Sequence, residues 1–334
     1  MKLHLTRRGL VATVAAALTM LGTATLAQEK ITLRLSSPAS ETDQRAVALL
    51  EEFGPAISEF ATFEPHWNAT LFKQGTELEA ISRGNLDMSI ASAQELAVFF
   101  PEFSIFTAGY VHQDAEHQVR VFNDPLMDEF KQKVEDELGV KLLTVMYLGE
   151  RHVNLRGDQE VQTPEDLAGV KLRMPNTDAW IFLGQALGAE PVPVAFTEIY
   201  TALQTGTVDG QENPLPTVVD AKFYEVTDQV ALTSHLVDLN YLAISLDVWN
   251  SLTPEQQETL QAAADEAAAF GRENQLAKEE ELVTFLEEQG LRIYEPDLEA
   301  FRTHVQEQYM NSDYAKDWPE GALERINELG AEGG

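Results

Sequence analysis

The chain has 334 residues, of which 44% are hydrophobic, enough to form one large domain or two ordinary ones. Its 55 acidic and 23 basic residues give a formal net charge of −32, which argues against nucleic acid as a partner because phosphate binding requires a basic face. The sequence contains no cysteine, which excludes disulfides, thiol catalysis and thiolate metal sites.

The first 27 residues differ from the rest of the chain. Three basic residues precede an apolar run over 9–21, and small residues ending at Ala27 follow. This pattern predicts a secretory signal peptide cleaved after Ala27, and therefore export to the periplasm, by either the general or the twin-arginine route. The apolar run is shorter than the roughly 20 residues that span a membrane, which argues against an anchor.

Strand-like and helix-like patterns alternate after this segment. The first group comprises a strand over 31–37, a helix over 43–60, a strand over 63–69, a helix over 76–85 and a strand over 86–92. This order predicts an α/β domain with a largely parallel sheet. Such sheets bind ligands at the carboxyl ends of their strands.

A second group of the same kind begins with a strand near 140–149. It continues with a strand over 169–174, a helix over 178–187, a strand over 190–194, a helix over 196–206 and a segment over 208–214. Two such groups predict two lobes with a cleft between them. We assign 28–147 plus 240–278 to lobe I and 148–239 plus 279–334 to lobe II, with the chain returning to lobe I through 239–252.

The strongest helix pattern follows this return. Thr253 has the features of an N-cap, Pro254 those of a first helical residue, Gln256 completes a capping box, and Gly290 ends the pattern. At 1.5 Å per residue this helix is roughly 50 Å long, longer than one small lobe is wide. We therefore expect it to span both lobes.

The sequence lacks the common catalytic and phosphate-binding motifs, including G-x-S-x-G, G-x-G-x-x-G and H-E-x-x-H. His112 and Glu116 stand four residues apart, a spacing that can hold a metal on a helix. With no third ligand in view, we favour an exposed polar helix start for this pair. No catalytic residue, cofactor or metal is predicted, and an enzyme acting on an anionic substrate is the least favoured function.

Cations in strand-like or polar settings are the remaining candidates for a binding site, with Arg151 and Arg156 among them. In "GVKLRMP" (169–175), apolar residues alternate with Lys171 and Arg173, and Pro175 ends the strand. The rigid fork of an arginine matches a carboxylate with two hydrogen bonds, so Arg173 is a candidate anion ligand. The alternative is a surface salt bridge with one of the many acids.

Three uncharged residues near these cations each have two interpretations. Asn213, in "GQENP", is either a turn residue before a proline or an amide that binds a ligand oxygen. Trp180 and Phe196 are either ordinary core or the apolar walls of a pocket. Spacing alone does not decide between these interpretations.

The segment "GVKLRMPNTDAWIFLGQALGAEPVPVAFTEIYTALQTGTVDGQENPLP" (169–216) resembles the signature region of the substrate-binding proteins of tripartite ATP-independent periplasmic (TRAP) transporters. The similarity extends through "KFYEV" (222–226) and, more weakly, back to "QGTELEAISRGNLDMSIAS" and "FFPEFSIF". The resemblance implies an extracytoplasmic binding protein with two lobes, each a central β-sheet flanked by helices, and a long helix spanning both. Such a protein closes around an organic acid and delivers it to two membrane subunits driven by a sodium gradient.

The resemblance also implies the residues of the site. Arg173 would form the paired contact with the ligand carboxylate, Arg151 and Asn213 would line the same cleft, and Phe196 would pack on the ligand. The other residues assigned to ligand binding are Trp180, Ser37, Glu77 and Ser92.

The resemblance leaves the ligand open. Small polar residues in the first lobe suit a hydroxylated acid, and we favour a sugar acid such as a hexuronate. A C4-dicarboxylate, another carboxylate or a sulfonate is the alternative, and for a dicarboxylate Arg156 or Lys73 would supply a second cation. The sialic-acid branch of the family tends to have an acidic residue near Ser92 and a basic one near Glu95, which this chain lacks. A ligand sensor that docks on a membrane receptor would share the same pocket.

Overall fold

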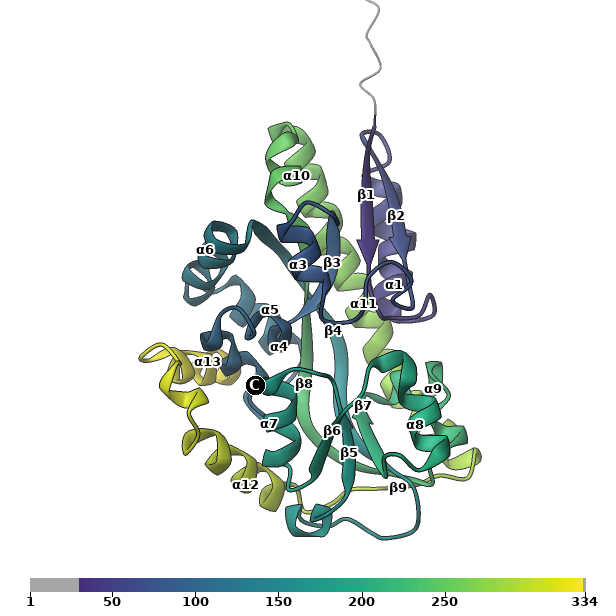
Figure 1. Ribbon diagram of the computed structural model, residues 1–334. Coiled ribbons are helices and arrows are strands. Elements are labelled where there is room, and N and C mark those ends of the chain that lie inside the picture. Colours follow the sequence, from purple (N-terminus) through teal and green to yellow (C-terminus); the bar gives the residue numbers. More distant parts are fainter. Residues whose placement is uncertain (1–29, 333–334) are drawn as a thin grey trace, which may run out of the picture.

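The computed structural model describes residues 30–332 (Figure 1). The predicted signal peptide and its cleavage site lie outside the described residues. Within 30–332, no helix has both the length and the hydrophobicity that crossing a membrane requires.

The described strands form a single nine-stranded sheet in the order β2-β1-β3-β8-β4-β7-β5-β6, with β9 paired to β8. The strands are β1 (Ile31–Ser36), β2 (Ala61–His66), β3 (Met88–Ser92), β4 (Val140–Leu155), β5 (Lys171–Met174), β6 (Glu190–Pro193), β7 (Gly210–Asn213), β8 (Gln229–Ser245) and β9 (Arg292–Tyr294). The predicted strands are present, and β4 and β8 are much longer than their sequence patterns indicated.

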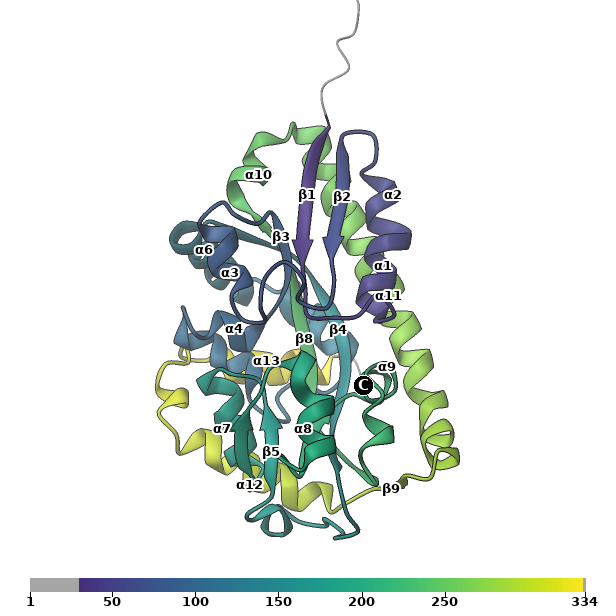
Figure 2. The same ribbon diagram turned by 45° about the vertical axis from the view of Figure 1, so that its right-hand side comes forward.

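The helices cover both faces of this sheet (Figure 2). They are α1 (Gln44–Ala48), α2 (Gly54–Ala56), α3 (Glu77–Ser82), α4 (Ala93–Leu96), α5 (Ala115–Asn123), α6 (Leu126–Leu138), α7 (Asp178–Ala186), α8 (Ile199–Thr205), α9 (Leu215–Asp220), α10 (Leu246–Ser251), α11 (Pro254–Glu288), α12 (Leu298–Met310) and α13 (Ala322–Ala331). A π-helical turn over Leu49–Phe53 joins α1 to α2 within the predicted helix 43–60.

Two long antiparallel strands connect the lobes. β4 has 16 residues and β8 has 17, so each extends about 50 Å at 3.3 Å per residue, and they pair along most of their length. Parallel strands β1–β3 lie at one end of this pair and parallel strands β5–β7 at the other. The strands of the two lobes thus belong to one continuous sheet, and the sheet is mixed because β4 and β8 run antiparallel to each other and to β7 and β3, respectively, whereas β9 pairs with β8 in parallel.

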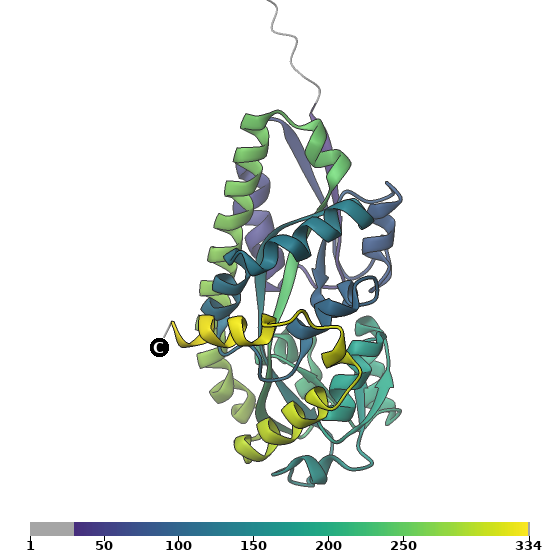
Figure 3. The same ribbon diagram turned by 90° about the vertical axis from the view of Figure 1, so that its left-hand side faces the viewer.

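The long helix α11 confirms the sequence prediction. Thr253 caps it, Gln256 completes the capping box, and Pro254 is its first residue. It runs along one side of the molecule, in contact with α1, β4 and α9 (Figure 3).

Three main hydrophobic clusters stabilise the molecule. One lies between β1, β2 and α11, a second surrounds α8 and α9, and a third on the other side extends from Phe103 through Leu172 to Phe301. The C-terminal part contacts both predicted lobes, because α12 packs on α7 whereas α13 packs on α5. The exact lobe boundaries remain a prediction.

Candidate functional site

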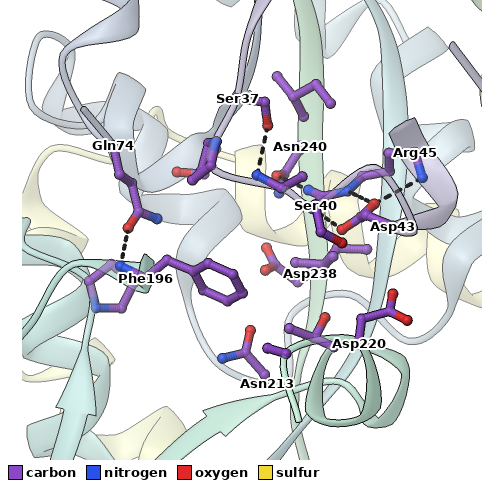
Figure 4. Close-up of a pocket in the computed structure, with 18 of the residues that line it drawn as sticks. Ser37, Ser40, Asp43, Arg45, Gln74, Phe196, Asn213, Asp220, Asp238 and Asn240 are labelled. Atoms are coloured by element: carbon purple, nitrogen blue, oxygen red, sulfur yellow. Dashed lines mark hydrogen bonds and ion pairs between the residues drawn. The ribbon is translucent and has the colours of Figure 1, made fainter. Parts of the chain in front are cut away.

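A cavity of 180 Å³ lies between the two groups of strands (Figure 4). The carboxyl ends of four strands lead into it, because Ser37 follows β1, Ser92 ends β3, Pro175 follows β5 and Asn213 ends β7. This is where a ligand site is expected in such sheets. The cavity is lined by residues of both predicted lobes.

Arg173 of β5 reaches this cavity from the lobe II side. Its neighbours Leu172 and Met174 are buried in the core, whereas its own side chain, only 1% exposed, points to the cavity. Nε donates a 2.7 Å hydrogen bond to the carbonyl of Val194, and Nη2 is buried without a partner. Burial lowers the pKa of this guanidinium, and the nearby charge of Glu212 only partly opposes that effect.

Arg151 of β4 is neutralised by acids. It donates to the side-chain Oε1 and the backbone carbonyl of Glu212, both at 2.6 Å, and to Asp238 Oδ2 at 2.7 Å. Although burial disfavours the charge, Glu212 and Asp238 together raise the pKa of Arg151. Its guanidinium lies 4.6 Å from the ring centre of Trp180, which forms a wall of the cavity.

A buried histidine extends this network away from the cavity. His235 Nε2 lies 3.2 Å from Glu212 Oε2, and His235 Nδ1 lies 2.8 Å from the hydroxyl of Thr233. Burial lowers the pKa of His235 despite the adjacent carboxylate. Glu212 is thus held on two sides, which fixes the guanidinium of Arg151.

A third arginine, Arg45 of α1, lines the cavity and was missed by the sequence analysis. Its Nε and Nη2 donate to Asp43 at 2.9 and 2.7 Å, and its Nη1 donates to Asn240 Oδ1 at 2.5 Å. Asp43 also caps α1 through the amide of Arg45. The contact with Asn240 could not be found from the sequence, because Asn240 is 195 residues away.

The remaining predicted residues lie as follows. Asn213 is buried in the cavity wall and donates to Gln211 Oε1 at 2.5 Å. Phe196 is half-buried, packs on Phe223 at a ring separation of 5.9 Å, and lines the cavity. Ser37 Oγ accepts from the amide of Ala39 at 3.2 Å.

Ser92 and Glu77 occupy different surroundings. Ser92 lines the cavity and caps α4, with its hydroxyl accepting from the amide of Glu95 at 3.2 Å. Glu77 lies outside the cavity, because α3 directs its carboxyl to the amide of Thr76 and into a separate crevice of 240 Å³. Glu95 lines both spaces.

The pair proposed as a weak metal candidate does not share a helix. His112 precedes α5, is buried and stacks on Phe106, whereas Glu116 forms an ion pair with Arg272 at 2.8 Å. Among the described residues, no group of three or more metal-ligating side chains comes together.

The family model for "Bacterial extracellular solute-binding protein, family 7" matches residues 48–316. The chain belongs to this family. Among the solved structures, the chain is similar to a TRAP periplasmic solute-binding protein from Roseobacter denitrificans with bound 3-deoxy-D-manno-oct-2-ulosonic acid (KDO). That structure is 73% identical with a TM-score of 0.90, over 90% of this chain and all of the other.

More distant relatives are named for other ligands. A second Roseobacter denitrificans protein, solved with L-galactonate, is 27% identical with a TM-score of 0.81, over 90% of this chain and 99% of the other. The sialic acid-binding periplasmic protein SiaP of Vibrio cholerae is 34% identical over 71% of this chain and 73% of that protein. The family is thus one of solute receptors with the two-lobed α/β fold.

Proposed function

We propose that this family member captures a sugar acid between its lobes and delivers it to the membrane subunits of a TRAP transporter. The favoured ligand is KDO or a closely similar ulosonic acid. This extends the sequence-based expectation of a hexuronate to a longer acid of the same chemical class. The 73% identical protein solved with KDO supports the choice.

The proposal rests on the different hydrogen-bond partners of the three arginines that line the cavity. Arg151 and Arg45 each contact carboxylates, whereas within residues 30–332 the guanidinium of Arg173 donates only to a backbone carbonyl and leaves Nη2 unpartnered. A buried guanidinium without an acid favours an anionic partner strongly, because a carboxylate restores both its charge balance and its hydrogen bonds. We assign the ligand carboxylate to Arg173.

The carboxyl groups of the cavity wall favour hydroxyl groups on the ligand. Four carboxyl-bearing residues line it, namely Asp43, Asp220, Asp238 and Glu95. Carboxylates accept hydrogen bonds from hydroxyls and repel a second anion. A hydroxylated monoacid therefore fits better than a dicarboxylate.

The cations suggested for a dicarboxylate lie elsewhere. Arg156 is exposed beside Gly206 and does not line the cavity. Lys73 is exposed in the wall of a second, larger cavity of 710 Å³, which shares Glu95, Trp180 and Phe196 with the first. This adjoining space supports a ligand with a long hydroxylated tail.

Export and a membrane partner complete the proposal. The related proteins SiaP and the 2,3-diketo-L-gulonate-binding protein YiaO of Escherichia coli are named as periplasmic. Together with the signal-peptide pattern of the first 27 residues, this supports a periplasmic location and uptake through sodium-driven membrane subunits.

Calorimetric titration with KDO, D-galacturonate, L-galactonate and succinate tests the proposal. Two or three charge-assisted hydrogen bonds with apolar burial predict roughly micromolar affinity for KDO and much weaker binding of succinate. Recovery of KDO chemically unchanged after incubation separates a receptor from an enzyme. Tight binding of succinate without binding of any sugar acid would overturn the proposal.

A further inference from the structure

Two glutamates from different helices share a crevice next to the ligand cavity. Glu77 of α3 and Glu95 of α4 both line it, and Glu95 also lines the ligand cavity. Within the described part of the chain, neither carboxyl forms an ion pair with a cation. Glu95 thus connects the ligand cavity to a second acid, Glu77, which does not line that cavity.

The two carboxyls are held differently. Glu95 Oε2 accepts from the amide of Ser92 at 2.9 Å, as part of the capping box of α4. Glu77 is only 4% exposed; its Oε2 accepts from the amide of Thr76 at 2.9 Å, and its Oε1 is buried without any partner. A buried carboxylate oxygen without a donor is costly, and protonation removes that cost.

The surrounding charges favour a proton on Glu77. Burial and the charge of Glu95 raise the pKa of Glu77 to about 8, although hydrogen bonds from the backbone amides of Glu77, Gly75 and Thr76 oppose this shift. Burial also raises the pKa of Glu95; the hydrogen bonds from Ser92 and the charge of Arg45 of α1 oppose this shift, whereas Asp238 of β8 adds to it. The strands and helices that pack on α3, namely β3, α6, β4 and β8, contribute no ion pair to Glu77 among the described residues.

We propose that Glu95 is a specificity-determining residue that accepts hydrogen bonds from the hydroxylated part of the ligand. In this proposal Glu77 retains a proton, which allows Glu95 to remain ionised beside the anionic ligand. This inference rests on the proposed function. An ionised Glu95 binds hydroxyls and repels a second anionic group. A protonated Glu77 keeps the pair at one negative charge, since two close buried carboxylates do not ionise together.

The pH dependence of KDO affinity tests the proton on Glu77. In the parent chain, calorimetry should give similar affinity at pH 6 and 7 and about tenfold weaker binding at pH 9, because ionised Glu77 adds a second charge near the ligand. Glu77→Gln imitates the protonated acid, so it should bind KDO within about threefold of the parent at pH 7 and lose the decline toward pH 9.

Glu79→Gln is the matched control. Glu79 is on the same helix, exposed, and paired with Arg83 at 2.5 Å. Its substitution removes one charge from α3 without changing Glu77 or Glu95, so the decline in KDO affinity toward pH 9 should persist. If the decline in affinity toward pH 9 came from Arg173 instead, both the Glu77 and the Glu79 variants would retain it. A parent affinity that is constant to pH 9, or a Glu77→Gln variant that retains the decline, would overturn the inference.

The function of Glu95 is tested with KDO and its 8-phosphate, which differ only by a second anionic group. The parent should bind KDO and discriminate against the phosphate, and Glu95→Gln should reduce that discrimination about tenfold. An unchanged ratio would overturn the assignment of Glu95 while leaving the proposed function intact. If the parent bound no sugar acid at any pH, the proposed function and this inference would both fail.

Discussion

Gln74 and Phe196 form a direct hydrogen bond across the ligand cavity. The side-chain Oε1 of Gln74 accepts from the backbone amide of Phe196 at 3.0 Å, although the residues are 122 positions apart (Figure 4). Gln74 follows β2 in predicted lobe I, and Phe196 follows β6 in predicted lobe II. The bond therefore stabilises the approach of the two lobes rather than the fold of either one.

Gln74→Ala should weaken ligand affinity about three- to tenfold, since a hydrogen bond contributes about 0.5–1.5 kcal/mol. The loss should appear mainly as faster dissociation, which stopped-flow fluorescence measures. Gln132→Ala is the control, because Gln132 is bonded only to Asp136 of its own helix. Equal dissociation rates for the parent and the Gln74 variant would contradict a closing function for this bond.

Arg173→Ala should reduce affinity for a sugar acid by at least a hundredfold, because about two charge-assisted bonds of 1.5–3 kcal/mol each are lost. Unfolding should occur at an equal or higher temperature, since the change removes a buried charge that no acid neutralises. Calorimetry and thermal denaturation measure the two effects. Arg156→Ala, which changes an exposed residue outside the cavity, should leave both the affinity and the unfolding temperature unchanged. Retention of affinity in Arg173→Ala would reject the assignment of the ligand carboxylate to Arg173.

Gly149→Ala should destabilise the fold by about 2 kcal/mol or more. Gly149 lies in β4 near the predicted passage between lobes, has φ of +132°, and leaves no room for a methyl group beside Glu279 and Pro214. Gly290→Ala is the matched control, because Gly290 has φ of +98° and open space around it. Urea unfolding should show the smaller loss for Gly290→Ala, and equal losses would exclude steric crowding as the cause.

Glu279 of α11 should make stability depend on pH. Its carboxylate accepts from Tyr147 Oη at 2.9 Å and from the amide of Glu150 at 3.0 Å, and burial raises its pKa to about 7. Because the folded pKa lies above the unfolded value of 4.5, its stabilising contribution is complete below pH 4.5 and is lost as pH rises to 7.

Glu279→Gln should remove this loss, which amounts to roughly 2–3 kcal/mol of unfolding free energy between pH 4.5 and 7. Urea unfolding at several pH values measures it. Glu287→Gln, an exposed change on the same helix, should keep the slope of the parent. A parent-like slope in Glu279→Gln would show that another group titrates.

Local elements were predictable because their signals are local. The cap formed by Thr253, Pro254 and Gln256 lies within one helical turn, and it located the start of α11. Alternation over 31–37 and 86–92 located β1 and β3 in the same way. The full lengths of β4 and β8 were not predictable, because they depend on pairing between residues about 100 positions apart.

The sequence by itself determined the two groups of local elements, the long helix α11 and, through the resemblance, the family and the prediction that Arg173 binds the ligand. Only the tertiary structure decided which charges meet. Arg151 pairs with Glu212 and Asp238, Arg45 reaches Asn240, and Arg173 forms no ion pair with any acid that the structure describes. Electrostatic partners in a buried site depend on distances of a few ångströms in space. With 55 acidic residues in the chain, no local pattern specifies which acid each arginine meets.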